Sequence, residues 1–152
     1  MSSYEEYEKV QRYRHIADIG EGIYLGSAGA ACAATLTELD IGFVIHLIPF
    51  EDSDKVYGIT YSGYLLSDDS SHADRMIEIA KDVFNQLITL VNGGKRVLIC
   101  CSQGKSRSAA IVAYWIMNRY GIGIDDAINR ISKVRRININ RGFYAALSKL
   151  KN

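Results

Sequence analysis

The amino-acid sequence predicts an α/β fold in which helices cover both faces of a mostly parallel, twisted β-sheet. Short apolar runs that suit strands alternate along the chain with segments of helical periodicity. The run that ends at residue 100 is apolar at successive positions, as in a strand that is buried on both faces. The chain has 152 residues, of which 48% are hydrophobic. We therefore expect residues 1–152 to form a single domain with a continuous core.

The N-terminal half of the chain is expected to alternate between helices and strands. Alanine-rich composition favours a helix, whereas β-branched and aromatic residues favour strands. The expected elements are a helix over residues 3–14, a core strand that begins at 23–25, a helix over 28–39, a buried strand over 43–48 and a strand over 60–66. Pro49, the only proline, ends the strand over 43–48, because proline cannot donate a hydrogen bond to a sheet ladder.

The C-terminal half is expected to contain the central strand and four helices. Residues 74–92 carry apolar side chains at helical spacing and polar ones between them, which predicts an amphipathic helix. Residues 107–120 are apolar on nearly all sides, which predicts a buried helix. The remaining expected elements are a strand over 96–100 and helices over 125–134 and 141–150.

Composition and charge exclude several classes of function. The formal net charge of +1 does not indicate nucleic acid or a membrane surface as a partner. No apolar run approaches the roughly 20 residues that span a bilayer, and the polar, acidic N-terminus does not resemble a signal peptide. Three cysteines, two of them adjacent, do not form a disulfide framework and suit a reducing compartment. We therefore expect a protein of the cytoplasm or nucleus; the sequence does not specify its oligomeric state.

The segment from Cys101 to Ser108 lies between the expected central strand and the buried helix. Amides at a helix start lack intrahelical partners, and the helix dipole adds partial positive charge, so such a loop can bind an anion. Gly104 permits a positive φ or a close approach of the backbone, and the Arg107 fork can bind two phosphate oxygens. We therefore expect a phosphate site. Its loop would consist of Ser102, Gln103, Gly104, Lys105 and Ser106.

Cys101 is the candidate nucleophile of this site. The positive field of the loop should stabilise a thiolate, which is a strong nucleophile in covalent catalysis. The Ser108 hydroxyl could donate a hydrogen bond to the thiolate when it leaves again. The alternative is a buried cysteine in an ordinary strand-to-helix turn. A Cys-x5-Arg spacing is weak evidence by itself, but the strand before it, the glycine within it and the helix after it make it specific.

The segment resembles the signature loop of the cysteine-based protein phosphatases, Cys-x5-Arg-Ser/Thr, and is most similar to the small dual-specificity phosphatases. Residues 23–27, 41–47 and 142–147 also resemble segments of that family, so the resemblance covers nearly the whole chain. It implies a dual-specificity phosphatase-like fold with Cys101 as nucleophile, Arg107 as phosphate ligand and residues 102–106 as amide donors. It also implies hydrolysis of phosphotyrosine and phosphoserine or phosphothreonine in proteins through a cysteinyl-phosphate, without metal or cofactor.

A proton donor is needed because a phenolate or an alkoxide leaves poorly. The segment from Leu65 to Asp74 contains two adjacent carboxylates, Asp68 and Asp69, and resembles the acid loop of the same family. Its register favours Asp69 as the general acid, with Asp68 as the alternative. Either aspartate could instead cap the helix after this segment, since Asp is a good N-cap residue.

The chain departs from the family just before the nucleophile, where Cys100 replaces the usual histidine that helps to order the loop. A thiol is only a weak donor and acceptor. The vicinal thiols raise the hypothesis of a reversible Cys100–Cys101 disulfide after oxidation, against the alternative that Cys100 fills a buried strand position. Three arginines, Arg135, Arg136 and Arg141, could either help to bind a phosphorylated substrate or form a solvated basic edge.

Other functions stay open as alternatives. A phosphopeptide-binding pseudo-phosphatase would share the fold, although its mark is a replaced nucleophile or arginine, and Cys101 and Arg107 are both present. Lys105 occupies a loop position that is also lysine in some phosphoinositide phosphatases, although Ser102 and Gln103 beside it are neutral. The absence of a two-domain length and the presence of Ser108 and Asp69 argue against a rhodanese-like sulfurtransferase. A Cys-His acyl-transfer enzyme would need a histidine base near Cys101, and no such base is required if the loop itself makes the thiolate.

Overall fold

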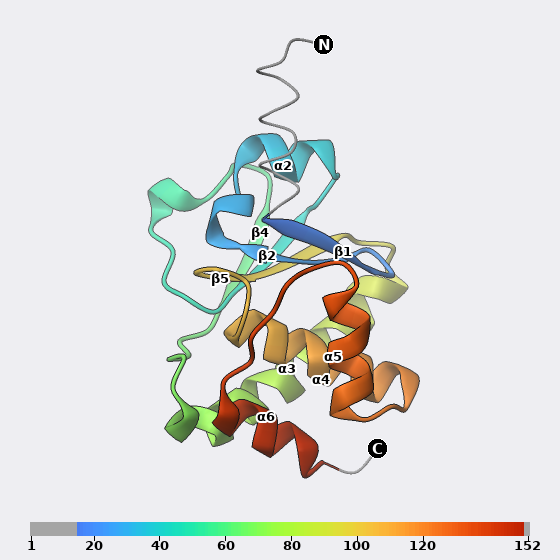
Figure 1. Cartoon of the computed structure of the whole chain (residues 1–152). Helices are drawn as coiled ribbons and strands as arrows, with labels where there is room; N and C mark the ends of the chain where they lie inside the picture. The colour runs from blue at the N-terminus through green and yellow to red at the C-terminus, as the bar shows by residue number, and fades with distance from the viewer. Residues whose placement is uncertain (1–14, 151–152) are drawn as a thin grey trace, which may run out of the picture.

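A five-stranded sheet forms the centre of the structure (Figure 1). The computed structural model describes residues 15–150, and the helix expected over residues 3–14 lies outside this part. The strands lie in the order β1 (Ile16–Gly20), β2 (Ile23–Ser27), β5 (Val97–Cys101), β3 (Phe43–His46) and β4 (Thr60–Gly63). β1 pairs with β2 antiparallel, and the other three pairings are parallel. The predicted mostly parallel α/β fold is therefore confirmed.

β5 is the middle strand because its residues are apolar on both sides of the backbone. It pairs with β2 on one side and with β3 on the other, and all five of its residues are buried. Three strands, β2, β5 and β3, thus end side by side at one edge of the sheet. In open parallel sheets this carboxyl edge is where ligands bind.

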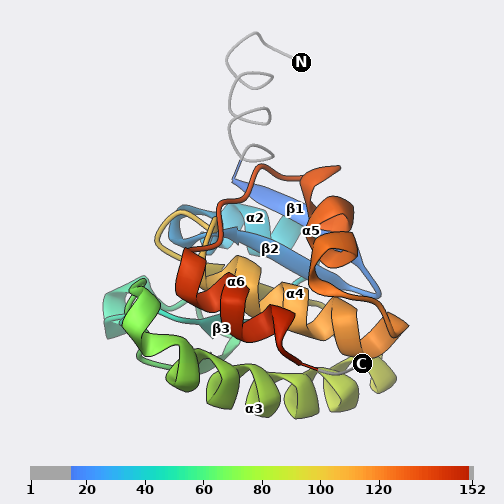
Figure 2. The ribbon, with the colours of Figure 1, turned by 60° about the horizontal axis from the view of Figure 1, so that its bottom comes forward.

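Helices cover both faces of the sheet, as Figures 1 and 2 show. One face is covered by α3 (Ala73–Asn92), α4 (Arg107–Tyr120), α5 (Ile124–Ser132) and α6 (Arg141–Ser148). The other is covered by α2 (Ala33–Glu38) and the short 3-10 helix η1 (Ala28–Ala30). Because successive side chains of a strand point to opposite faces, Ile99 belongs to the first apolar core and Leu98 to the second.

The two principal helices have the faces that their sequences predict. α4 is buried along most of its length, with Trp115 1% exposed, and it packs on β2 and β5 of the sheet and on α3. α3 buries one stripe of side chains, including Met76, Val83 and Leu87, and exposes the opposite side. The expected helices over 107–120 and 74–92 are confirmed, and both position the segments that flank the candidate site.

Three elements differ from the sequence-based expectation. The helix expected over 28–39 is divided into η1 and α2, because Cys32 is extended and the preceding alanines, Ala30 and Ala31, are buried against the sheet. The strand expected over 60–66 ends at Gly63, and the chain then leaves the sheet toward 3-10 helix η3 (Ser70–His72). β1 was not expected, since five residues at a sheet edge give little periodic signal.

Candidate active site

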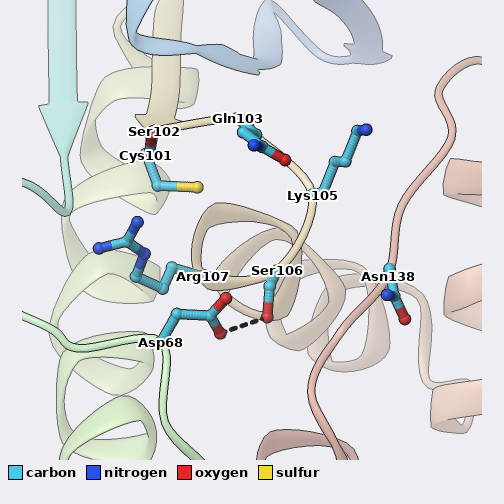
Figure 3. Close-up of a pocket in the computed structure, with 8 residues that line it drawn as sticks. All are labelled: Asp68, Cys101, Ser102, Gln103, Lys105, Ser106, Arg107 and Asn138. Atoms are coloured by element: carbon cyan, nitrogen blue, oxygen red, sulfur yellow. Dashed lines mark hydrogen bonds between the residues drawn. The ribbon is translucent and has the colours of Figure 1, made fainter.

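The carboxyl edge of the sheet carries a cavity of about 290 Å³ around the β5–α4 loop. Cys101 is the last residue of β5, and Arg107 is the first residue of α4. The residues that line the cavity are Asp68, Cys101, Ser102, Gln103, Lys105, Ser106, Arg107 and Asn138 (Figure 3). Most of the residues that the sequence singles out therefore meet in one place. Asp68 joins them, whereas Asn138 was not anticipated.

The carbonyls of residues 102–105 all accept hydrogen bonds from other parts of the protein. The carbonyl oxygen of Ser102 accepts from the Ala28 amide at 3.3 Å, and that of Lys105 accepts from the Asn138 amide at 2.8 Å. The carbonyls of Gln103 and Gly104 accept from the Arg135 guanidinium at 2.6 and 3.0 Å. Within residues 15–150, the amides of residues 102–106 donate to no other residue. These amides are thus available to an anion.

Gly104 satisfies two requirements of the loop. Its φ is +69°, a left-handed conformation that L side chains rarely adopt. A Cβ atom at this position would lie 2.4 Å from the carbonyl oxygen of Gly26 on β2. The glycine that the sequence marks in the loop is therefore required both by its backbone conformation and by the close approach of β2.

Cys101 lies at the floor of the cavity and contacts Ser108. Its Sγ is 3.1 Å from the Ser108 Oγ, and the two residues are 3% and 0% exposed. The Ser108 hydroxyl can donate to a thiolate, since a thiolate has no proton of its own. The first turn of α4 holds Ser108 behind the Cys101 Sγ, at a position from which its hydroxyl can stabilise negative charge on sulfur.

Arg107 carries an unsatisfied donor in a protected position. Its Nη1 donates to the Leu66 carbonyl at 3.3 Å, which ties the arginine to the segment before Asp68. Its Nε is buried and has no hydrogen-bond partner within residues 15–150. Leaving a buried donor unsatisfied costs free energy, so such atoms in folded proteins call for an explanation. An anion in the cavity would supply the missing acceptor.

The two adjacent aspartates occupy different environments. Asp68 lines the cavity, and its carboxylate accepts from the Ser106 hydroxyl at 2.7 Å and from the Asn140 side-chain amide at 2.8 Å. Asp69 is instead the N-cap of η3 and accepts from the Ser71 amide at 2.8 Å. The hydrogen bond from the Ser71 amide lowers the pKa of Asp69 below its ordinary value, so a smaller fraction of Asp69 carries a proton near neutral pH.

Asn140 is a site residue that the sequence reasoning missed. It caps α6 by accepting from the Phe143 amide at 2.9 Å, and it also donates to Asp68. The Gly142 amide donates to the Ser70 hydroxyl at 3.0 Å, so the start of α6 is bound to the acid loop twice. An asparagine directly before an expected helix is an N-cap signal, and that signal could have identified Asn140.

Cys100 lies on the opposite face of the sheet from Cys101. Cys101 belongs to the core under α3 and α4, and Cys100 to the core under α2. Burial raises the pKa of the Cys100 thiol to about 12, so it remains protonated at physiological pH. A disulfide needs side chains that face each other, and adjacent residues of a regular strand point apart. The geometry therefore favours Cys100 as a buried strand residue over a disulfide partner of Cys101.

The described residues offer neither a metal-binding cluster nor a membrane-spanning helix. Among residues 15–150, no three His, Cys, Asp or Glu side chains form a group that could bind a metal ion. None of the helices described here is long and apolar enough to cross a membrane. The three cysteines are all free.

Comparisons with known proteins identify the family of this chain. Residues 23–152 match the family described as dual specificity phosphatase, catalytic domain. The chain is 34% identical over 143 residues to the tyrosine-protein phosphatase candidate AMV078 of Amsacta moorei entomopoxvirus, covering 88% of this chain and 84% of that protein.

Solved structures share the fold. A mouse dual-specificity phosphatase candidate crystallised with zinc tungstate superposes with a TM-score of 0.79 at 24% identity, covering 90% of this chain and 86% of that one. The human tyrosine phosphatase-like serine/threonine/tyrosine-interacting protein gives a TM-score of 0.71 at 24% identity, covering 88% and 93%. The family match over most of the chain and the viral relative establish that this protein belongs to the family of dual specificity phosphatase catalytic domains.

Proposed function

We propose that the protein hydrolyses phosphate esters of tyrosine and of serine or threonine in proteins through a cysteinyl-phosphate intermediate. One observation carries the proposal: Cys101, the unsatisfied Nε of Arg107 and the unpaired loop amides meet around one cavity of the described chain, with Asp68 at its wall. A phosphoryl group satisfies all of these donors at once and presents its phosphorus atom to sulfur.

In the first step, the Cys101 thiolate attacks phosphorus, and an S–P bond forms while the ester P–O bond breaks. The loop amides and Arg107 stabilise the charge on the equatorial oxygens. Asp68, in its protonated form, gives its proton to the leaving oxygen of the substrate. We assign the acid to Asp68 because it lines the cavity, whereas Asp69 is engaged in capping η3.

In the second step, water attacks phosphorus and the S–P bond breaks. The Asp68 carboxylate takes the proton from that water, which returns the acid to its starting state. The Ser108 hydroxyl donates to the sulfur that leaves as a thiolate, consistent with its 3.1 Å contact. Inorganic phosphate is released, and Cys101 returns to its thiolate form.

We propose a broad range of phosphorylated substrates because the residues around the cavity are exposed. Ser102, Gln103 and Lys105 are exposed at its edge, and Asp68 and its neighbour Asp69 are exposed on the acid loop. Phosphorylated proteins of the cytoplasm or nucleus are the substrates we propose, since a free catalytic thiol needs a reducing compartment.

The test is hydrolysis of 4-nitrophenyl phosphate and of matched phosphotyrosine and phosphothreonine peptides, in the presence of a chelator. We expect wild type to hydrolyse all three and Cys101→Ser to hydrolyse none. Binding of the peptides without turnover by wild type would favour the phosphopeptide-binding alternative. Turnover of phosphoinositides with none of the peptides would favour the lipid alternative.

A further inference from the structure

We infer that Arg135 is a positioning residue that keeps two carbonyls of the phosphate loop turned outward, so that two loop amides face the bound phosphoryl group. The inference rests on the proposed function and adds a residue to its site. Arg135 lies in the connection between α5 and α6, which runs alongside the loop (Figure 1). It does not line the cavity.

The contacts of Arg135 use the shape of its guanidinium. Its Nε donates to the Gly104 carbonyl at 3.0 Å, and its Nη2 donates to the Gln103 carbonyl at 2.6 Å. Two donors in one plane therefore hold two successive carbonyls. A lysine has a single nitrogen on a flexible stem and cannot reproduce this fork. Arg135 is 9% exposed, so these bonds are shielded from competing water.

Because a peptide unit is planar, a hydrogen bond that holds its carbonyl also orients its amide. In a trans peptide unit the C=O and the following N–H point in opposite directions. The Gln103 carbonyl shares its unit with the Gly104 amide, and the Gly104 carbonyl shares its unit with the Lys105 amide. Holding both carbonyls on Arg135 therefore fixes the direction of both amides, which lack an acceptor within residues 15–150.

The packing around Gly104 leaves the loop little freedom. A Cβ atom on Gly104 would lie 2.9 Å from the Arg135 Nη2 and 2.4 Å from the Gly26 carbonyl oxygen. The loop backbone is thus held between β2 on one side and the guanidinium on the other. The Cys100 thiol, which points to the other face of the sheet, cannot contribute to this order.

Charge adds to the positional effect. Burial lowers the pKa of Arg135, while the negative charge of a Cys101 thiolate opposes that shift. Arg136, the next residue, is exposed and has no such contact with the loop in the described part of the chain.

The experiment measures tungstate binding by calorimetry in a Cys101→Ser background, which removes turnover from the readout. Arg135→Lys keeps the positive charge but loses the two coplanar donors that hold the loop carbonyls. We expect this variant to bind tungstate about tenfold or more weakly than its parent. Arg136→Ala removes a neighbouring positive charge and should change the affinity by less than about twofold. Melting temperatures of all variants are recorded alongside.

The outcomes separate the inference from the function on which it rests. If Arg135→Lys is less stable but binds tungstate as tightly as its parent, Arg135 is merely structural and the inference is wrong. Equal losses in Arg135→Lys and Arg136→Ala would also overturn it. If the Cys101→Ser parent fails to bind tungstate, the phosphate site itself is refuted. As a second measurement in the active enzyme, Arg135→Lys should raise KM for 4-nitrophenyl phosphate.

Discussion

At the residue scale, the two adjacent aspartates show how one position along the chain places two identical side chains in different environments. Asp68 faces the cavity and is held by Ser106 and Asn140. Asp69 turns to the start of η3, where the Ser71 amide lowers its pKa. The sequence register favoured Asp69, and both residues suited either role. Their environments differ only because of the direction in which the chain leaves β4. The apolar periodicity of the sequence carries no information on that direction.

Substituting each aspartate by asparagine tests this assignment. Asp68→Asn removes the proton donor, and kcat for a phosphothreonine peptide should fall by about 10²- to 10⁴-fold. The loss should be smaller for 4-nitrophenyl phosphate, whose leaving group needs less protonation. Asp69→Asn is the matched control, since asparagine also caps well and should leave kcat near wild type. A large loss in Asp69→Asn with an active Asp68→Asn would return the role to Asp69.

At the element scale, the start of α6 holds the acid loop in place. Asn140 binds Asp68, and Gly142 packs so closely on Ser70 that a Cβ atom would lie 2.3 Å from the Ser70 carbonyl oxygen. The glycine and the helix after it were visible in the sequence. Their contact with residues 68–70 was not, because it joins segments about 70 residues apart through side chains of common types.

A second contact between elements predicts a pH dependence of stability. Glu21, in the turn between β1 and β2, accepts from the Arg119 Nη2 at 2.7 Å and from the Tyr120 hydroxyl at 3.1 Å near the end of α4. The hydrogen bonds from Arg119 lower the pKa of Glu21 from its ordinary 4.5. The stabilising contribution of the charged Glu21 is therefore fully present above pH 4.5, and it is lost as the pH falls through the lower pKa of Glu21 in the folded protein.

Urea unfolding of Glu21→Gln and wild type between pH 7 and pH 3 measures this contribution. The variant should unfold at lower urea concentration than wild type at pH 7, and the two midpoints should converge as the pH falls below the lowered pKa. Glu51→Gln, on an exposed turn away from any basic partner in the described chain, serves as control and should show no such convergence. A midpoint difference that stays constant with pH would contradict the role of the Glu21 charge.

At the scale of the whole molecule, apolar periodicity predicts the principal elements, and packing decides the details that the sequence does not reveal. The sheet, α3 and α4 arise from apolar spacing, and they are confirmed. The helix expected over 28–39 is broken, because burying Ala30 and Ala31 against the sheet outweighs the helical propensity of alanine. The site loop was visible because a strand, a glycine and a helix mark it. Arg135, Asn138 and Asn140 reach it from the distant α5–α6 connection.

The most direct measurement of the central claim is rapid acid quench of the enzyme during turnover of 4-nitrophenyl phosphate, followed by mass spectrometry of its peptides. We predict one added phosphoryl group on Cys101, absent from Cys101→Ser and more abundant at high substrate concentration. Sustained turnover by wild type without any phosphoryl group on Cys101, or turnover that persists in Cys101→Ser, would contradict the cysteinyl-phosphate route.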